Sequence, residues 1–455
     1  MPAVWHPKID PESGLYSTDA ADLNNWDMYP GDNYPEPYSW VQFTADYPQP
    51  CDGLQGVFSF VDMYEGYTGT VTLGGPVTTN WMVQRDGVID QPLGHASDIT
   101  VYGAWTWSGG EINPSGVPAQ VQVSGMYMSG FADLSGALTL GSSLVFDTGT
   151  VAAFSASMTV TQERAGIDVQ GGSQFTMLGE SLINALNTLA DRNTIRVGGA
   201  MTKFTTVGST SSALGLWVMG GTAETTPTAE GVSVARFSGP IRQANGTAPF
   251  QLAPTVSCYM TNGNLIVDER TMLTVTNDRD ILIRGGKLAT RVLTVDDLGS
   301  ATIVARTLRI DQQLTGTTTE IVVGDPALNP AGINGHHYSH LVVLGEVQWR
   351  GGVYRPLVDT RPTGTKSSLW SSTGTFTIGS PNDDPNLTGT APTIGTVNRP
   401  DTDPLPAGRP YTIIMTDAVI GRVSVPTSAG PGWKVLPRLA ADQPDQELVI
   451  ESIPI

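Results

Sequence analysis

The stretch Gln120-Val121-Gln122-Val123, followed by Ala137-Leu138-Thr139-Leu140, shows the pattern that decides the fold. Apolar side chains alternate with Gln or Thr, which is the period of a β-strand with one buried face. Each run is three to five residues long and is bounded by Gly, Asn or Asp in most cases. Runs of this kind recur at 57–61, 70–73, 99–102, 158–160, 194–197, 273–275, 281–283, 292–295 and 321–323.

The runs are too short and too numerous for an ordinary sandwich, and helices between parallel strands are nearly absent. The one exception is 182–191, where Leu182, Leu186 and Leu189 stand at helical spacing and predict a helix. Short strands, frequent turns among 52 Gly and 32 Pro, and a repeat of about 20 residues are typical of a solenoid. We therefore predict an all-β chain, folded as a single-stranded right-handed parallel β-helix with apolar ladders inside and Thr, Ser and Asn outside.

Three regions of the chain differ in composition and in the periodicity of their apolar residues. Residues 1–55 are rich in Trp, Tyr, Pro and Asp without periodicity, which predicts an irregular, aromatic-packed N-terminal cap. Residues 56–335 carry the strand repeats and form the predicted β-helix. Residues 336–455 are interpreted as a β-rich C-terminal cap with antiparallel pairing, interrupted by a Pro/Asp/Gly-rich insertion near 360–405.

The composition excludes several classes of protein. Charged residues make up 15% of the 455 residues, and the formal net charge is -19. A disordered acidic chain has more charge for each apolar residue, and a nucleic-acid binder needs basic patches against phosphates. No stretch approaches the roughly 18 apolar residues of a transmembrane helix. We expect no nucleic-acid partner and no membrane insertion.

The two cysteines and the N-terminal residues are informative about the cellular compartment of the protein. Cys51 and Cys258 are far apart in sequence and are interpreted as buried free thiols. The first residues lack a basic segment and an apolar core, so we expect no signal peptide in this chain. An exported protein would then be a mature form or would use another export route.

Two groups of segments resemble known β-helix proteins. The first group is Tyr67-Thr68-Gly69-Thr70-Val71-Thr72-Leu73 and Trp105-Thr106-Trp107-Ser108-Gly109-Gly110. It resembles the opening coils of large secreted β-helix proteins of planctomycete bacteria. The second, His340-Leu341-Val342-Val343-Leu344-Gly345-Glu346-Val347 with Leu405-Pro406-Ala407-Gly408, is similar to the terminal coils of autotransporter-passenger-like β-helices, with His340 where Asp is usual. The resemblance implies an exported surface or matrix protein and no shared catalytic residues.

Histidines and acidic residues form candidate sites. His336 and His340 could share a metal ion if a turn brought them together, although the alternative is a polar entry to a strand. Asp383 and Asp384 in the insertion offer oxygen ligands for calcium, although no EF-hand or nonapeptide calcium repeat is present. We expect no resident cofactor, and calcium is the ion that the acidic insertion could bind.

Paired carboxylates raise the question of polysaccharide cleavage. Asp278 and Asp280, Asp296 and Asp297, then His336 follow the order of the acidic and histidine motifs of pectin-degrading β-helix hydrolases. The Gly after the histidine and the Arg-x-Lys motif are missing, and Asp pairs are also common at solenoid corners. Catalysis requires these carboxylates to converge within about 5–10 Å. The alternative assignment is a β-helix lyase, or no catalytic site at all.

Trp105 and Trp107 share one face of a strand. Facing outward they would form a stacking platform for glycans, and facing inward they would pack the core. We expect an extracellular or cell-surface structural or adhesive protein that assembles with itself end to end into filaments or a surface layer. The alternative is a carbohydrate-binding or polysaccharide-degrading β-helix protein, whose partner is an extracellular polysaccharide.

Overall fold

The computed structural model confirms an all-β chain for the residues that it describes. These are 2–11, 13–27, 39–90, 98–112, 120–124, 131–140, 143–161, 166–185, 194–199, 201–219, 221–228, 233–237, 241–244, 264–268, 270–275, 280–291, 299–312, 318–325, 338–358, 367–379, 392–395, 410–417, 420–422, 433–440 and 443–452. Within them the only helical element is the 3-10 turn η1 (Leu23–Asn25), and no helix is long and apolar enough to cross a bilayer.

The chain divides into two compact units, which are described separately. The first contains 1–204 and 211–215, and the second contains 205–210 and 216–455. β17 (Lys203–Val207), β18 (Thr210–Ser212) and β19 (Gly215–Met219) have residues in both. The other strands of the first unit are β1 (Ala3–Trp5), β2 (Trp26–Asp27), β3 (Ser39–Phe43), β4 (Cys51–Met63), β5 (Thr70–Gln84), β6 (Val88–Asp90), β7 (Ile99–Trp107), β8 (Glu111–Ile112), β9 (Gln120–Ser124), β10 (Phe131–Leu140), β11 (Ser143–Asp147), β12 (Val151–Val160), β13 (Ile167–Val169), β14 (Gln174–Leu178), β15 (Leu182–Ala185) and β16 (Thr194–Gly198).

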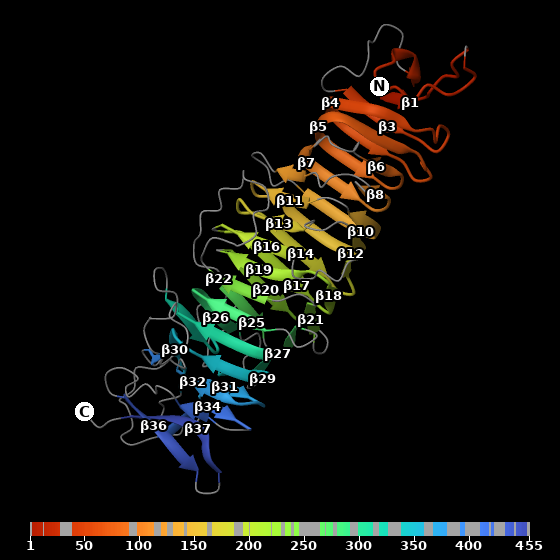
Figure 1. The fold of residues 1–455 in the computed structure, drawn as a ribbon. Helices are drawn as coiled ribbons and strands as arrows, with labels where there is room; N and C mark the ends of the chain where they lie inside the picture. Colours follow the sequence, from red (N-terminus) through yellow and green to blue (C-terminus); the bar gives the residue numbers. More distant parts are fainter. Residues whose placement is uncertain are drawn as a thin grey trace. The chain divides into compact units, whose positions relative to one another are not determined.

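From β6 to β16 the strands of the first unit pair in parallel along three ladders (Figure 1). One ladder runs β7–β9–β11–β13–β16, and the second joins β7, β10, β12 and β14. The third joins β6, β8, the end of β10, the end of β12, and β15. β3, β4 and β5 pair directly with one another in parallel, whereas from β7 on, strands that follow one another in sequence enter different ladders.

Apolar side chains stack on one another inside these ladders. Phe154, Phe175 and Phe204 come from successive repeats, with ring centroids 5.9 Å and 5.7 Å apart. At the N-terminal side, β1 pairs with β2 antiparallel and with β3 in parallel. There Trp5 packs edge-on against Trp26, with the ring centroids 5.0 Å apart, so the first strands bury aromatic side chains. Such stacks contribute apolar burial with defined geometry.

The helix predicted for 182–191 is wrong in the part that the structure describes. Residues Leu182–Ala185 form β15, which pairs in parallel with Ser157–Val160 of β12. Ile183 is buried on the inner face, whereas Leu182 is half-buried. The backbone hydrogen bonds of the ladder outweigh the helical spacing of the leucines, because propensity is a weak prior against tertiary pairing. Residues 186–191 lie outside the described residues.

The second unit has the same three-ladder arrangement (Figure 1). Its strands are β20 (Thr222–Thr226), β21 (Ser233–Phe237), β22 (Ile241–Ala244), β23 (Asn264–Asp268), β24 (Thr271–Val275), β25 (Ile281–Arg284), β26 (Gly286–Arg291), β27 (Gly299–Asp311), β28 (Thr319–Val322), β29 (Ser339–Trp349), β30 (Val353–Arg355), β31 (Leu369–Ser372), β32 (Phe376–Ile378), β33 (Thr393–Ile394), β34 (Pro410–Thr416), β35 (Ile420–Arg422), β36 (Trp433–Ala440) and β37 (Gln443–Ser452). The ladders run β20–β23–β26–β28–β30–β33, β21–β24–β27–β29–β31–β34 and β22–β25–β27–β29–β32–β35.

The C-terminal strands depart from the parallel pattern. β37 pairs antiparallel with both β34 and β36. Parallel pairing itself continues past residue 335, through β29 to β34 and β35. Antiparallel pairing, which the sequence predicted for the region 336–455, is therefore present in its last strands.

Gly136 allows two neighbouring repeats to approach closely where β10 bends from one ladder to the next. Its φ is +78°, and a Cβ built at this position would lie 2.1 Å from the carbonyl oxygen of Ser108. Gly149 has a similar φ of +76°, but a Cβ built there meets nothing within 4 Å. The two glycines therefore share the backbone requirement and differ in the space around them.

We predict that Gly136→Ala destabilises the protein more than Gly149→Ala. Gly149→Ala carries only the strain of a left-handed backbone, about 1 kcal/mol. Gly136→Ala adds a clash with a backbone oxygen, which brings the loss to about 3 kcal/mol. Denaturant midpoints of the two variants test this, and equal losses would contradict the close approach at Ser108.

Candidate functional site

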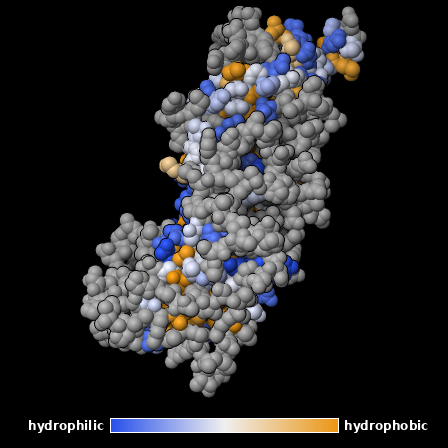
Figure 2. All heavy atoms as spheres, turned by 60° about the vertical axis from the view of Figure 1, so that its left-hand side comes forward, coloured by the Kyte–Doolittle hydropathy of each residue, from blue (hydrophilic) through white to orange (hydrophobic). Residues whose placement is uncertain are grey.

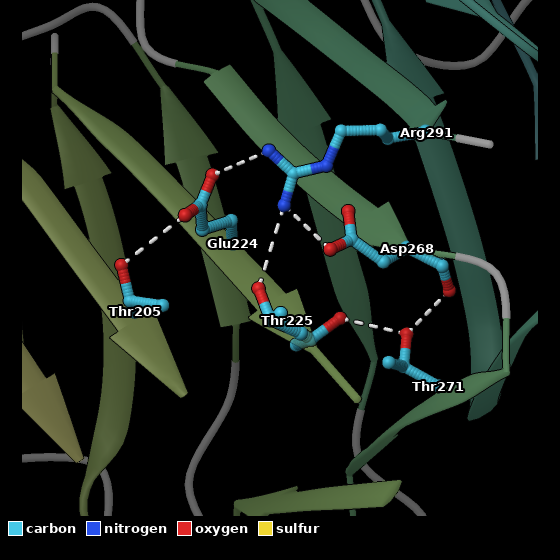
Figure 3. A network of polar contacts seen from close by, with 7 residues as sticks. Thr205, Glu224, Thr225, Asp268, Thr271 and Arg291 are labelled. Atoms are coloured by element: carbon cyan, nitrogen blue, oxygen red, sulfur yellow. Dashed lines mark hydrogen bonds and ion pairs between the residues drawn. The ribbon is translucent and has the colours of Figure 1, made fainter. Parts of the chain in front are cut away.

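A group of three buried charges lies on the ladder formed by β20, β23 and β26. Figure 3 shows Glu224 from β20, Asp268 from β23 and Arg291 from β26, which converge across three adjacent strands. Alternation along β23 places Asp268 on the face opposite Leu265 and Val267. We call these three residues the buried charge cluster.

Arg291 is the centre of the cluster. Its Nη2 donates to Asp268 Oδ2 at 2.5 Å, and its Nη1 lies 3.4 Å from Glu224 Oε2. Asp268 and Arg291 are direct Cα partners, so the ladder register places the two side chains next to each other. Glu224 belongs to the strand beyond, and Arg291 therefore ties three repeats together.

Hydroxyl groups fix the backbone beside the cluster. Thr271 Oγ1 donates to the carbonyl oxygen of Asp268 at 2.6 Å, and it lies 2.9 Å from Thr225 Oγ1 (Figure 3). Thr205 Oγ1 contacts Glu224 Oε1 at 3.4 Å, which is long for a hydrogen bond. The corner after Asp268 is thus held by a buried pair of threonines.

Burial dominates the electrostatics of the cluster. The side chain of Asp268 is 0% exposed, and burial raises its pKa from the ordinary 3.8 to about 6, against the opposing effect of Arg291. Its second oxygen, Oδ1, has no hydrogen-bond partner in the described part of the chain. A buried carboxylate with one free oxygen is costly while it is ionised, and less costly when it is protonated.

The cluster can hold a proton near neutral pH, but it is closed to a polymeric substrate. Asp268 and Glu224 are both buried, and Arg291 is mostly buried. A general acid or base must reach its substrate within hydrogen-bond distance. In this structure the three side chains reach one another, so their chemistry is that of a structural ion pair with a titratable member.

Most of the acidic and histidine candidates from the sequence lie outside the described residues. These are Asp278, Asp296, Asp297, His336, Asp383 and Asp384. Asp280 is described, immediately before β25. It makes a bidentate ion pair with Arg306 of β27, at 2.9 and 2.7 Å, on the surface. The convergence of the four carboxylates remains a prediction.

His340 lies near the start of β29 and is half-buried. Its Nε2 lies 2.6 Å from Ser371 Oγ of β31, and burial lowers the pKa of the imidazole. The described residues contain no group of three or more His, Cys, Asp or Glu side chains placed to hold a metal ion. The structure thus assigns His340 a cross-strand hydrogen bond, while the partner proposed for it, His336, is not described.

Trp105 and Trp107 face inward. Both side chains are fully buried, and the two indoles stack at 5.3 Å with an interplanar angle of 17°. Their faces are closed to a sugar, so the glycan platform proposed for this pair is wrong and the core-packing alternative holds. Cys51 is also buried, with its pKa raised by burial, in agreement with a buried free thiol.

The buried charge cluster was not found from the sequence. Its members are 44 and 23 positions apart in a ladder whose spacing varies with each loop. One local signal exists, because Asp268 ends the apolar run Leu265-Ile266-Val267 and Arg291 ends a run that begins at Leu288. Charges inside strand patterns are candidates for buried pairs, but only the register shows which ones meet.

Comparison of the chain with known protein families, with curated proteins and with solved structures found no match.

We predict that Arg291→Leu destabilises the protein by about 3–5 kcal/mol at pH 7, because the buried carboxyl group of Asp268 loses its cation. Arg306→Leu is the matched control, since it removes the same chemistry from an exposed pair and is expected to cost at most about 1 kcal/mol. Urea denaturation of both variants measures the difference. Similar losses would show that the cluster is no more buried in solution than the surface pair.

We predict a specific pH dependence from Asp268. The folded state binds the proton more tightly than the unfolded state, so this carboxyl stabilises less as pH rises from about 4 to about 7. The free energy of unfolding of wild type relative to Asp268→Asn should therefore fall by about 3 kcal/mol over this range. A difference that stays constant with pH would mean that Asp268 titrates normally.

Proposed function

We propose that the chain is an extracellular or cell-surface structural and adhesive protein, whose units are stretches of right-handed parallel β-helix. It acts through many polar contacts along its strands, without chemistry on a substrate. Parallel ladders entered in turn by successive strands support the β-helix assignment. The resemblance to secreted β-helix proteins supports the location.

The observation that carries the proposal is the pairing of charges between strands. Ion pairs join side chains of different repeats at Asp62–Arg85, Asp168–Arg196, Asp268–Arg291, Asp325–Lys287, Glu320–Arg355 and Asp280–Arg306. Each of these carboxylates is engaged in holding repeats in register. This use of charge favours a scaffold over an acid–base site.

The described surface fits multivalent polar contact. Outward positions of β12 include Ser155, Ser157 and Thr159. On the face shown in Figure 2, described apolar side chains reach the surface as small separate patches among polar ones. Small patches of this kind are usual for a surface that is not a large apolar interface.

Self-assembly is part of the proposal. Stacking of one chain on the next through their end strands would be a heterologous contact, and such contacts build filaments when they do not close into a ring.

We predict that the protein is reached from outside the cells that produce it. A membrane-impermeant biotin reagent should label its lysines on intact cells, or the chain should be found in the culture medium. A cytoplasmic enzyme from the same cells serves as the control. Labelling only after lysis would contradict the proposed location.

Imaging and an activity screen separate the proposal from its alternatives. Filaments or ordered sheets in negative-stain images would support self-assembly of a structural protein, and dispersed particles that calcium does not change would count against it. Release of reducing ends from polygalacturonate by wild type, but not by an Asp278→Asn/Asp296→Asn double variant, would replace the structural role with an enzymatic one.

A further inference from the structure

We propose that the outer face of β3, β4 and β5 is a binding site for a neutral glycan, with Trp81 as its main contact. The site is a row of aromatic side chains, Trp40, Phe60 and Trp81, which we call the aromatic platform. It is distinct from Trp105 and Trp107, which are buried on the inner face.

The register places the three aromatic residues in one line. Trp40 is the Cα partner of Phe60, and Phe60 is the partner of Trp81. The rings of Trp40 and Phe60 are 5.1 Å apart and tilted by 39°. Since neighbouring strands are about 4.8 Å apart, the ladder repeats an aromatic side chain at each step across the sheet.

Trp81 is the exposed member of the row. Its side chain is 53% exposed, although it belongs to a strand with a well-packed inner face. A Cβ built on Gly103 of β7 would lie 3.3 Å from Trp81 Nε1, so the indole rests beside a residue without a side chain. The next strand offers Ala104 opposite Trp81, which leaves the row open on that side.

Polar groups in fixed positions flank the platform. The Arg85 guanidinium lies over the ring of Tyr64 at 5.2 Å and donates to Asp62 Oδ1 at 2.8 Å. Gln42 Nε2 donates to the Tyr64 hydroxyl at 2.8 Å. Arg85 and Tyr64 remain partly exposed, and Arg85 follows the end of β5, four residues after Trp81, or about 13 Å in extended chain.

The chemistry of this surface matches a sugar chain. A pyranose offers an apolar face of C–H groups, which stacks on an aromatic ring, and an edge of hydroxyls, which bond to planar polar groups. The Asp62–Arg85 pair is neutral as a unit, so the site favours an uncharged glycan. A nucleic acid would also stack on aromatic rings, but it needs a basic groove, and this chain has a net charge of -19.

The site is independent of the proposed structural role. A scaffold that presents a glycan site would be adhesive through it, and a scaffold without one would remain a scaffold. Failure of glycan binding therefore removes this inference and leaves the cell-surface proposal to its own labelling experiment.

The test is retention of the full chain on insoluble polysaccharides. Cellulose, chitin and mannan serve as neutral probes, with polygalacturonate as the anionic one, and the bound fraction gives the affinity. We expect binding to at least one neutral probe, largely insensitive to salt. Trp81→Ala should weaken it about tenfold, the loss of one aromatic contact, and Trp81→Phe should weaken it less.

Tyr16→Ala is the matched control, because Tyr16 is an exposed aromatic residue outside the platform. Thermal midpoints of all variants show whether a loss of binding comes from unfolding, and Trp81→Phe keeps the test valid if the alanine variant is unstable. The proposal is overturned if no neutral probe retains wild type, if Trp81→Ala binds as wild type does, or if retention is confined to polygalacturonate.

Discussion

Parallel backbone pairing between strands one repeat apart is the interaction on which the other features depend. Each strand is too short to be stable alone, and its hydrogen bonds are completed by the preceding and following repeats. Side chains alternate between faces, so a slip of one residue would exchange the buried and exposed sets. The apolar stacks, the ion pairs and the aromatic platform all require the same register.

The buried charge cluster shows how far this constraint reaches. Arg291 meets Asp268 because they are direct partners, and it reaches Glu224 on the strand beyond. An ion pair gains little stability from burial, since both charges lose their water. Its advantage is specificity, because a shifted register would separate buried opposite charges. The same burial raises the pKa of Asp268, which means that it disfavours the ionised carboxylate.

The tryptophans show how one pattern leads to two outcomes. Trp105 and Trp107 are two positions apart on β7, and both point inward. Trp81 is the Cα partner of Ala104, one position before Trp105, and it points outward. The alternation predicted that Trp105 and Trp107 share a face, but which face is buried depends on how β7 packs against the other strands. The candidate contact for a glycan is therefore Trp81 of the aromatic platform and not the buried pair Trp105 and Trp107.

The sequence by itself determined the all-β class, through alternating short runs that only strands can bury on one side. It also indicated the antiparallel pairing near the C-terminus and the buried state of Cys51. It did not determine that 182–185 is a strand, because four residues carry too little periodicity to outweigh helical leucine spacing. The cluster of Glu224, Asp268 and Arg291, and the row that ends at Trp81, were decided only by tertiary structure. Loops of unequal length separate their members, and only the hydrogen-bonded register specifies which residues become neighbours.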